Sequence, residues 1–367
     1  MESLKKNSNF VEDIVNGMFD WVRVIDRNST VIYMNKTMSD ALGNPETGLK
    51  CYQLIGRNEP CINCISREAI FDDKSHEKEE CIGDRFFSVM SSPIKNDEGE
   101  VIAVVEVLRD ITQVRQLQQQ LLGQNAKLND ELKLAKKLQS SLLPKQLPED
   151  KVNFSFVYKP CDELGGDFLD IYKIDERHIG IYIADVSGHG VPASMLTVFL
   201  RSTLNKKLLS PAKALQELYQ EFNTSRLDEN LYITIFYAMI DIEDMSMKFS
   251  NAGHNVCPII FNSDRFELLR LPGIPISNWL EKPEYRDGDA KLFKGDKVFF
   301  YTDGIVEMRN PANEQFGEER ILDLLLNSKL DSASTLNVIL DAASSFAGIT
   351  DFAGIMDDIT MALLKIL

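Results

Sequence analysis

The strongest constraint on the fold is a proline-free stretch, residues 112–143, that is rich in Gln, Leu, Lys and Asn and separates two regions of mixed pattern. Its seam positions alternate in spacing between three and four residues, as in a helix that pairs with a partner helix. Gln124 and Glu131 lie on the seam, so we expect an adjustable parallel coiled coil that joins two copies of the chain. The alternative is a single amphipathic helix packed on one of its own domains. The seam consists of Val114, Leu117, Leu121, Gln124, Leu128, Glu131, Ala135, Leu138 and Leu142.

The helix divides the 367 residues into an N-terminal domain over residues 1–112, a helical linker over 113–148 that Pro144 and Pro148 end, and a C-terminal domain over 149–367. Each flank has a usual length for one domain, about 50–250 residues. Hydrophobic residues make up 44% of the chain and charged residues 26%, which predicts folded domains rather than wholesale disorder.

The charge of the chain limits its partners. A formal net charge of −16 argues against non-specific binding to nucleic acid and to anionic membranes. No apolar stretch reaches the ~18 residues of a membrane span, and the polar start, MESLKKNSNF, does not have the pattern of a signal peptide. We therefore expect a cytoplasmic protein with reduced cysteines and with no nucleic-acid or membrane partner.

The N-terminal region contains two predicted β-hairpins. Residues 21–33 and residues 86–107 each place apolar, alternating segments on both sides of a polar turn. The second hairpin and the segment Val107–Thr112 that follows it resemble the closing part of PAS domains. Over residues 10–112 this resemblance implies a five-stranded antiparallel sheet with a pocket for a small-molecule ligand or cofactor, which the sequence does not identify.

Four of the six cysteines lie close together in the N-terminal region, at Cys51, Cys61, Cys64 and Cys81. Four thiolates of this kind could bind Zn²⁺ or an iron–sulfur cluster. Two other interpretations stay open: a redox pair, and cysteines that are merely small buried hydrophobic residues. The sequence favours the last, because only one Cys-x-x-Cys pair is present.

The C-terminal region alternates strand-like segments with short turns and adds four helical runs. Consecutive strands joined by short turns favour antiparallel sheets. With the N-terminal region, this predicts an α+β protein. The expected strands are residues 231–241, 247–250, 256–261, 297–301 and 359–366, and the expected helices are residues 192–206, 211–223, 317–328 and 334–346.

Aspartates at the ends of predicted strands form the candidate catalytic site. A strand end holds a carboxylate rigidly beside a cleft, and neighbouring glycines let backbone or ligand approach closely. Several converging aspartates suit Mg²⁺ or Mn²⁺, which prefer oxygen ligands. Two such ions can activate a water for in-line phosphoryl displacement, so that no Ser or Cys nucleophile is needed. The candidates are Asp167, Asp170, Asp185, Asp303, Asp357 and Asp358.

Five motifs follow one another in this region: Gly165-Gly166-Asp167, Ala184-Asp185-Val186-Ser187-Gly188-His189-Gly190, Asn251-Ala252-Gly253-His254, Tyr301-Thr302-Asp303-Gly304 and Asp357-Asp358-Ile359-Thr360. In this order they closely resemble the SpoIIE/RsbU branch of the PPM metal-dependent protein phosphatases, over residues 152–367. Lys136–Pro144 also resembles the helical lead-in to that catalytic domain. The resemblance implies an αββα sandwich with a binuclear Mn²⁺ or Mg²⁺ centre in a cleft at one edge.

By this resemblance, Asp185 bridges both metal ions, with help from the backbone carbonyl of Val186. Asp167 binds one ion, and Asp303 and Asp357 bind the other. Asp185 and Asp303 are accordingly the expected catalytic residues. Val186 stands where many relatives carry glycine, a difference that a carbonyl ligand tolerates.

Several neighbouring residues leave alternatives open. Asp358 competes with Asp357 for the last ligand position, because strand alternation lets only one of the pair face the cleft. Asp170 is a further candidate ligand. His189 and His254 are candidate general acids, although a structural hydrogen-bonding role is the better expectation for each.

The function expected from the resemblance is hydrolysis of phosphoserine or phosphothreonine on a partner protein, controlled by a signal that the PAS domain senses. The implied substrate is a phosphorylated anti-sigma-factor antagonist of the STAS type. A catalytically inactive docking module is the alternative, and the complete aspartate set argues against it. A nucleotide cyclase is a weaker alternative, because it explains Gly165-Gly166-Asp167 but not the later aspartate motifs.

Overall fold

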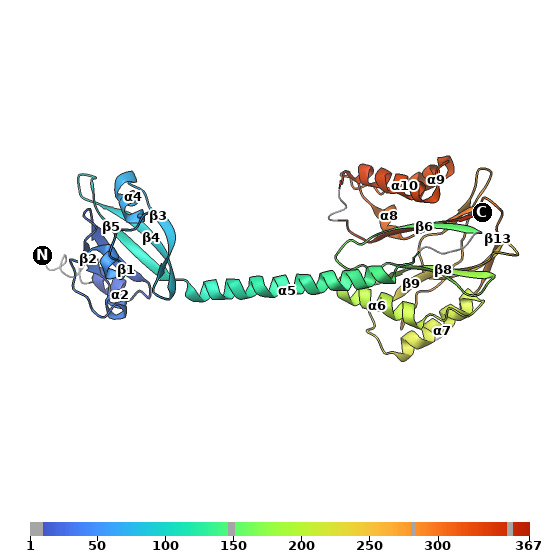
Figure 1. The fold of residues 1–367 in the computed structure, drawn as a ribbon, viewed down its shortest axis with the longest axis horizontal. Helices are drawn as coiled ribbons and strands as arrows, with labels where there is room; N and C mark the ends of the chain where they lie inside the picture. Colours follow the sequence, from blue (N-terminus) through green and yellow to red (C-terminus); the bar gives the residue numbers. More distant parts are fainter. Residues whose placement is uncertain (1–9, 146–150, 280–282, 351–354) are drawn as a thin grey trace. The chain divides into compact units, whose positions relative to one another are not determined.

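The structure of the chain is a computed structural model that describes residues 10–145, 151–279, 283–350 and 355–367 (Figure 1). It divides into two units, Met1–Lys127 and Leu128–Leu367. The boundary between them falls inside one long helix. Each unit has its own hydrophobic core and is described by itself.

The N-terminal unit is built on a five-stranded antiparallel sheet, in the order β2-β1-β5-β4-β3. Short helices pack on it around a core that includes Trp21, Phe87 and Leu108. The expected PAS-like sheet is therefore present, with β3 and the helices added to the two predicted hairpins. The elements are β1 (Trp21–Asp26), β2 (Val31–Met34), α2 (Lys36–Ala41), α3 (Cys51–Leu54), α4 (Ile65–Asp72), β3 (His76–Ile82), β4 (Arg85–Lys95) and β5 (Val101–Asp110).

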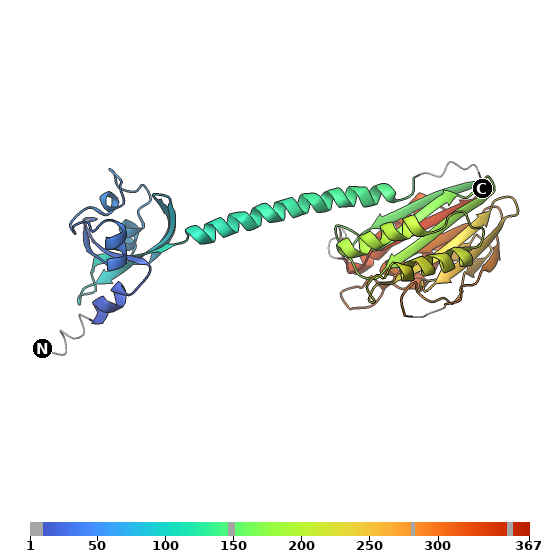
Figure 2. The same ribbon diagram turned by 90° about the horizontal axis from the view of Figure 1, so that it is seen from below.

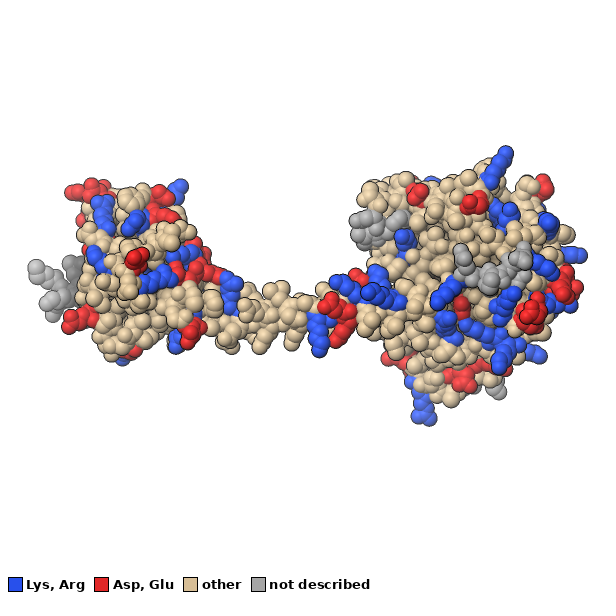
Figure 3. Space-filling model, viewed as in Figure 1, with Lys and Arg blue, Asp and Glu red and all other residues tan. Residues whose placement is uncertain are grey.

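The predicted linker forms one helix, α5 (Thr112–Leu142). Leu117, Leu121 and Leu128 on the predicted seam are more than half exposed in the single chain. The residues between Arg115 and Lys127 carry no charge, and they appear as an uncharged stretch in the N-terminal half of the helix in Figure 3. Within the described ranges, no helix is long and apolar enough to span a membrane. Pairing of α5 with a second copy stays a prediction.

The C-terminal unit contains two five-stranded antiparallel sheets, in the orders β13-β10-β9-β8-β7 and β12-β11-β14-β15-β6. The strands are β6 (Val152–Lys159), β7 (Phe168–Lys173), β8 (His178–Val186), β9 (Ile233–Asp241), β10 (Ser246–Ala252), β11 (Ile259–Phe261), β12 (Phe266–Leu268), β13 (Gly288–Lys291), β14 (Lys297–Tyr301) and β15 (Ile359–Ile366). The helices are α6 (Gly190–Thr203), α7 (Pro211–Thr224), α8 (Asp303–Glu307), α9 (Glu318–Asn327) and α10 (Ser332–Ala347).

Strand alternation makes this unit a four-layer sandwich. On β7, Leu169 and Ile171 point into the core between the two sheets, whereas Phe168 points into a second core under α6 and α7. A third core lies between the other sheet and helices α8, α9 and α10. Helices therefore cover both outer faces, α6 and α7 on one side and α9 and α10 on the other (Figures 1 and 2). This is the αββα arrangement that the resemblance implied.

Candidate metal centre

Four aspartates converge at one edge of the sandwich from the ends of its strands. Asp185 is the penultimate residue of β8, and Asp167 directly precedes β7, its neighbour in the sheet. In the other sheet, Asp303 begins α8 just after β14, and Asp357 lies just before β15. Because β14 and β15 pair with Tyr301 opposite Met361, the end of one and the start of the other meet at the same edge. Both sheets thus contribute carboxylates to one cluster.

The carboxylates repel one another strongly. Burial raises the pKa of Asp185 to about 8, and the charges of Asp303, Asp357 and Asp358 add to this shift. Burial also raises the pKa of Asp167 well above its usual range, and repulsion from Asp185 and Asp358 raises it further. Each of these shifts says that a negative charge is unfavourable there without a compensating cation.

The donor set suits hard divalent cations. Carboxylate oxygens from both sheets, with backbone carbonyls nearby, are the ligands that Mg²⁺ and Mn²⁺ prefer. In the described residues, no three acidic, histidine or cysteine side chains form a ready-made ligand set.

The two members of the aspartate pair have different surroundings. Asp358 is buried, and its carboxylate accepts hydrogen bonds from the backbone N–H groups of Cys161 (2.7 Å), Gly166 (2.5 Å) and Asp167 (3.1 Å). Asp357 is exposed by area, although the protein around it desolvates it and raises its pKa to about 6, helped by repulsion from Asp303. Asp358 thus holds the loop that carries Asp167, whereas Asp357 is free to face a ligand.

Two polar residues orient the cluster, and sequence reasoning had given neither of them a role. Thr302 donates its hydroxyl hydrogen bond to Asp167 (2.7 Å) and accepts one from the backbone N–H of Thr360 (3.0 Å). Asn255 donates to Asp303 (2.6 Å). Thr302 belongs to a recognised motif and Asn255 directly follows one, which is the signal that the sequence offered.

Comparison with known proteins agrees with this geometry. A family model described as Stage II sporulation protein E (SpoIIE) matches residues 175–367, which is 193 of the 367 residues. The chain belongs to the SpoIIE family. A second model, the PAS fold, matches residues 15–116 and confirms the N-terminal PAS domain. Both resemblances drawn from the sequence motifs are therefore confirmed.

Curated relatives of this SpoIIE-family chain include two proteins of Bacillus subtilis. It is 32% identical to phosphoserine phosphatase RsbP over 192 residues, which is 50% of this chain and 47% of RsbP. It is 26% identical to phosphoserine phosphatase RsbU over 269 residues, 71% of this chain and 78% of RsbU. The match thus spans about half the length of RsbP and most of RsbU.

Solved structures show the same fold. The SiaA-PP2C domain of Pseudomonas aeruginosa superposes with a TM-score of 0.58 at 21% identity, covering 66% of this chain and 98% of that domain. The RsbU and RsbW domains of a Mycobacterium tuberculosis protein superpose with a TM-score of 0.50 at 19% identity, covering 61% and 63%. The SpoIIE domain therefore has a PP2C-like fold.

Asp170 does not join the acidic cluster of the SpoIIE domain. On β7 it shares the helix-facing side with Phe168, and its buried carboxylate forms an ion pair with Lys206. Lys206 Nζ also lies 4.6 Å from the ring centroid of Tyr172. Asp170 therefore serves the packing of the helical layer, and the sequence-based suggestion that it is a metal ligand is not supported.

The predicted carbonyl ligand, Val186, lies against the Gly165–Asp167 loop. Its side chain is buried under α6, and its backbone N–H donates to the carbonyl oxygen of Gly166 (3.3 Å). A Cβ at Gly166 would stand 3.0 Å from the carbonyl oxygens of both Val186 and Gly188. Glycine at this position lets the two loops approach closely.

Gly304 is a second close approach. A Cβ there would stand 2.0 Å from the backbone oxygen of Asp358. Gly304→Ala is expected to displace the start of β15, to destabilise the domain by roughly 1–3 kcal/mol and to lower metal-dependent hydrolysis about 10²-fold. Urea unfolding and steady-state kinetics check this. Gly123→Ala, where the added Cβ meets nothing within 4 Å, is the control; equal effects of the two substitutions would contradict the interpretation.

The two histidines differ in exposure. The His189 side chain is 78% exposed, with Nδ1 3.9 Å from the carboxylate of Asp162. His254 is buried, which lowers its pKa to about 4, and its Nε2 lies 2.9 Å from the carbonyl oxygen of Tyr301. A carbonyl can only accept, so Nε2 carries the proton of a neutral ring. His254 is therefore a structural donor that holds the end of β14.

His254→Gln tests this role, because an amide can still donate to Tyr301. We expect its kcat/KM to stay within about tenfold of wild type, whereas loss of a general acid costs about 10²–10⁴-fold. His254→Ala, which leaves that buried carbonyl without its donor, should lower stability by roughly 1–3 kcal/mol. A larger loss of activity for the glutamine variant at unchanged stability would assign His254 to the chemistry instead.

The lead-in helix contacts the loop that carries Asp167 through a buried glutamine, and Lys136 of the same helix pairs with Glu163 in that loop (3.1 Å). Gln139, buried on α5, donates to the carbonyl oxygen of Gly165 (2.7 Å) and accepts from its N–H (3.2 Å). Its amide also lies 3.4 Å from the hydroxyl of Thr197 on α6. The end of the linker is thus hydrogen-bonded to the loop that carries Asp167. The lead-in motif contains Gln139, but the sequence did not predict this contact.

Proposed function

We propose that the chain is a metal-dependent phosphatase that removes phosphate from serine or threonine of a partner protein, under control of a signal that its PAS domain senses. The observation that carries the proposal is the convergence of four repelling aspartates at one edge of a PP2C-like sandwich. Kinship with RsbP and RsbU, both named phosphoserine phosphatases, supports the same reaction.

The proposed ligands divide by position. Asp185 interacts with the other three cluster members and would hold both ions, with the carbonyl of Val186. Asp167 would hold one ion, and Asp303 and Asp357 the other. The ions, Mn²⁺ or Mg²⁺, would supply an activated water and neutralise charge on the phosphoryl group. Asn255 and Thr302 keep the carboxylates oriented before the ions arrive, and Asp358 takes the part of loop anchor rather than ligand.

A protein substrate is supported by the surface beside the cluster. A groove of about 490 Å³ adjoins Asp357 and Gly304, and its apolar lining includes Met308, Ile349 and Ile355. Such a groove suits residues that flank a phosphoserine. By family resemblance, we propose a phosphorylated STAS-type protein as the substrate.

The test uses the full chain and a phosphoserine peptide with Mn²⁺ or Mg²⁺. We expect phosphate release that stops on addition of EDTA and resumes when the ion is restored. A phosphorylated STAS protein should be hydrolysed with a higher kcat/KM than the peptide. Silence with peptide and STAS protein alike, with metal binding intact, would favour the inactive docking module.

We further propose that α5 pairs with α5 of a second chain. Leu117 and Leu121 are 51% and 59% exposed in the single chain, which a helix seam explains. Leu117→Asp with Leu121→Asp is expected to convert a dimer to a monomer in light scattering at micromolar concentration. Gln116→Asp with Gln119→Asp adds the same charge at outer positions and should leave a dimer. A monomeric wild type contradicts the pairing.

A further inference from the structure

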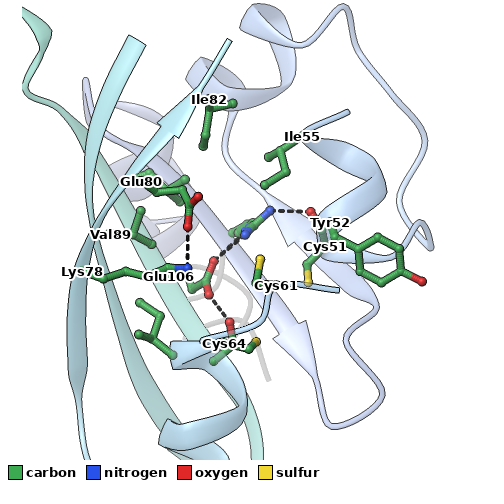
Figure 4. A pocket seen from close by; sticks show the side chains of 14 residues that line it. Cys51, Tyr52, Ile55, Cys61, Cys64, Lys78, Glu80, Ile82, Val89 and Glu106 are labelled. Atoms are coloured by element: carbon green, nitrogen blue, oxygen red, sulfur yellow. Dashed lines mark hydrogen bonds and ion pairs between the residues drawn. The ribbon is translucent and has the colours of Figure 1, made fainter. Parts of the chain in front are cut away.

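Three thiols surround one small cavity in the PAS domain. Cys51, Cys61 and Cys64 line it together with the buried ion pair of Arg23 and Glu106 (Figure 4). Cys81 does not join them. Lys78, Glu80 and Ile82 on alternate positions of β3 face the cavity, so Cys81, between two of them, lies on the opposite, exposed side. The four-cysteine set considered from the sequence is thus reduced to three.

The cavity is too small for an organic cofactor. Its volume is about 30 Å³, room for little more than one water, whereas ligand pockets commonly enclose about 300–1,000 Å³. No ready-made metal ligand set occurs in the described parts of the chain. The chemistry that remains at this position is that of the thiols themselves.

The three thiols are not equivalent. Cys51 is buried, and burial raises its pKa to about 11, so it stays protonated and unreactive. Cys61 and Cys64 are half-exposed. Arg57 donates a hydrogen bond to the sulfur of Cys61 (3.2 Å), and Cys64 is the N-cap residue of α4, where the helix places positive partial charge. Each sulfur-bearing residue therefore lies beside positive charge or partial positive charge.

Cys61 and Cys64 both line the cavity and are joined by a bend in the backbone. The chain bends at Ile62 and Asn63, and Lys78 donates to the carbonyl oxygen of Asn63 (3.1 Å), which holds the bend against β3. Ile62 is fully exposed and points away from the cavity. A Cys-x-x-Cys bend before a helix is the arrangement in which a disulfide can form with little movement.

We propose that Cys61 and Cys64 form a redox site that exchanges with small disulfides such as oxidised glutathione. The Cys61 thiolate attacks one sulfur of the small disulfide, forming a mixed disulfide and releasing one thiolate. The Cys64 thiolate then attacks Cys61 sulfur, forming the Cys61–Cys64 disulfide and releasing the second thiolate. The pair loses two electrons, the small disulfide gains them, and the two cysteine protons pass through solvent to the released thiolates.

The site has a route to the rest of the domain. Ser66, two residues after Cys64, donates to Glu106 on β5. Glu106 in turn pairs with Arg23 (2.7 Å), which donates to the carbonyl oxygen of Cys51 (2.9 Å). β5 ends at Asp110, and α5 starts at Thr112. A disulfide that shifts the start of α4 therefore acts on side chains packed against the strand that leads into the linker.

The test equilibrates the full chain, free of added metal, in buffers of reduced and oxidised glutathione. Acid quenching, alkylation and peptide mass spectrometry then locate each disulfide. We expect the peptide with residues 61–64 to lose two hydrogen masses in oxidising buffer and to regain them in reducing buffer. Cys61→Ser and Cys64→Ser should each abolish the internal disulfide, and the Cys61→Ser chain should form far less mixed disulfide than the Cys64→Ser chain. Cys81→Ser is the matched control and should behave as wild type.

A second measurement is independent of disulfide formation. In the reduced chain, iodoacetamide should label Cys61 at least about tenfold faster than Cys51. The proposal is overturned if residues 61–64 stay reduced in every buffer, if the disulfide instead joins Cys51 or Cys81, or if stoichiometric zinc protects all three thiols. None of these readouts depends on phosphatase activity, so failure here leaves the proposed function untouched.

Discussion

Asp185→Asn is expected to lower Mn²⁺-dependent hydrolysis of a phosphoserine peptide by at least about 10³-fold, because several kcal/mol of metal-derived transition-state stabilisation depend on its charge. Asp185 interacts with each of the other three cluster members, and burial together with neighbouring charges raises its pKa to about 8, so a nearby cation would stabilise its charged form. An amide keeps the shape of the side chain and removes that charge. Steady-state kinetics over a series of Mn²⁺ concentrations measures the effect.

The same substitution has an opposite effect on the metal-free fold. The pKa of Asp185 is raised in the folded chain, so the folded state holds a proton that the unfolded state releases. Stability is therefore fully present below the usual aspartate pKa of about 4 and is lost as pH rises toward about 8. In EDTA, Asp185→Asn should remove this part of the pH dependence and raise the midpoint of urea unfolding at pH 8.

A matched control separates charge from position. Asp323 on α9 is exposed and lies outside the cluster, so Asp323→Asn removes one charge from the same domain without touching the site. It should retain wild-type activity and pH dependence. Retention of activity by Asp185→Asn at saturating Mn²⁺ would contradict the ligand assignment, and a loss shared by both variants would point to a general effect of charge.

Long apolar elements could be predicted from the sequence, and short polar ones could not. β14 and β15 have the predicted bounds because each is a continuous apolar run bounded by polar turns. β13, Gly288–Lys291, carries one apolar residue and is a strand because it pairs with β10. β3 is equally polar and depends on β4 in the same way. Such polar segments become strands because they pair with a neighbouring strand, and the local sequence pattern does not show that pairing.

The same division holds at the site. Asp185 and Asp303 could be predicted because a strand end is a local feature. The contact of Gln139 with Gly165 and that of Asn255 with Asp303 join segments that are far apart in the sequence. Asp170 lies on the side of β7 that faces the helices, where its carboxylate pairs with Lys206 and not with a metal ion. The sequence did not show which side of β7 faces Lys206. The position of an aspartate along its strand could be predicted from the sequence. Which groups its carboxylate contacts depends on the layer packed against that side of the sheet.

The aspartate pair gives the sharpest test of this structure, because its two members should fail in opposite ways. Asp358→Ala leaves three N–H groups, two of them buried, without their acceptor, and hydrogen bonds to a charged group contribute about 1.5–3 kcal/mol each. We expect it to lower the free energy of unfolding by at least about 3 kcal/mol. We also expect it to abolish activity, because the loop that carries Asp167 is no longer held in place.

Asp357→Ala removes an exposed carboxylate that accepts one backbone hydrogen bond, from Asp358 (2.8 Å), and that repels Asp303. Its stability in EDTA should change by less than about 1 kcal/mol, while the Mn²⁺ concentration for half-maximal activity rises at least tenfold. Urea unfolding in EDTA and metal titration of activity together distinguish the two variants. If Asp358→Ala keeps its stability and Asp357→Ala keeps its metal affinity, the ligand assignment is reversed. The loop that carries Asp167 must then be held by contacts other than those to Asp358, such as the hydrogen bonds of Gln139 to Gly165.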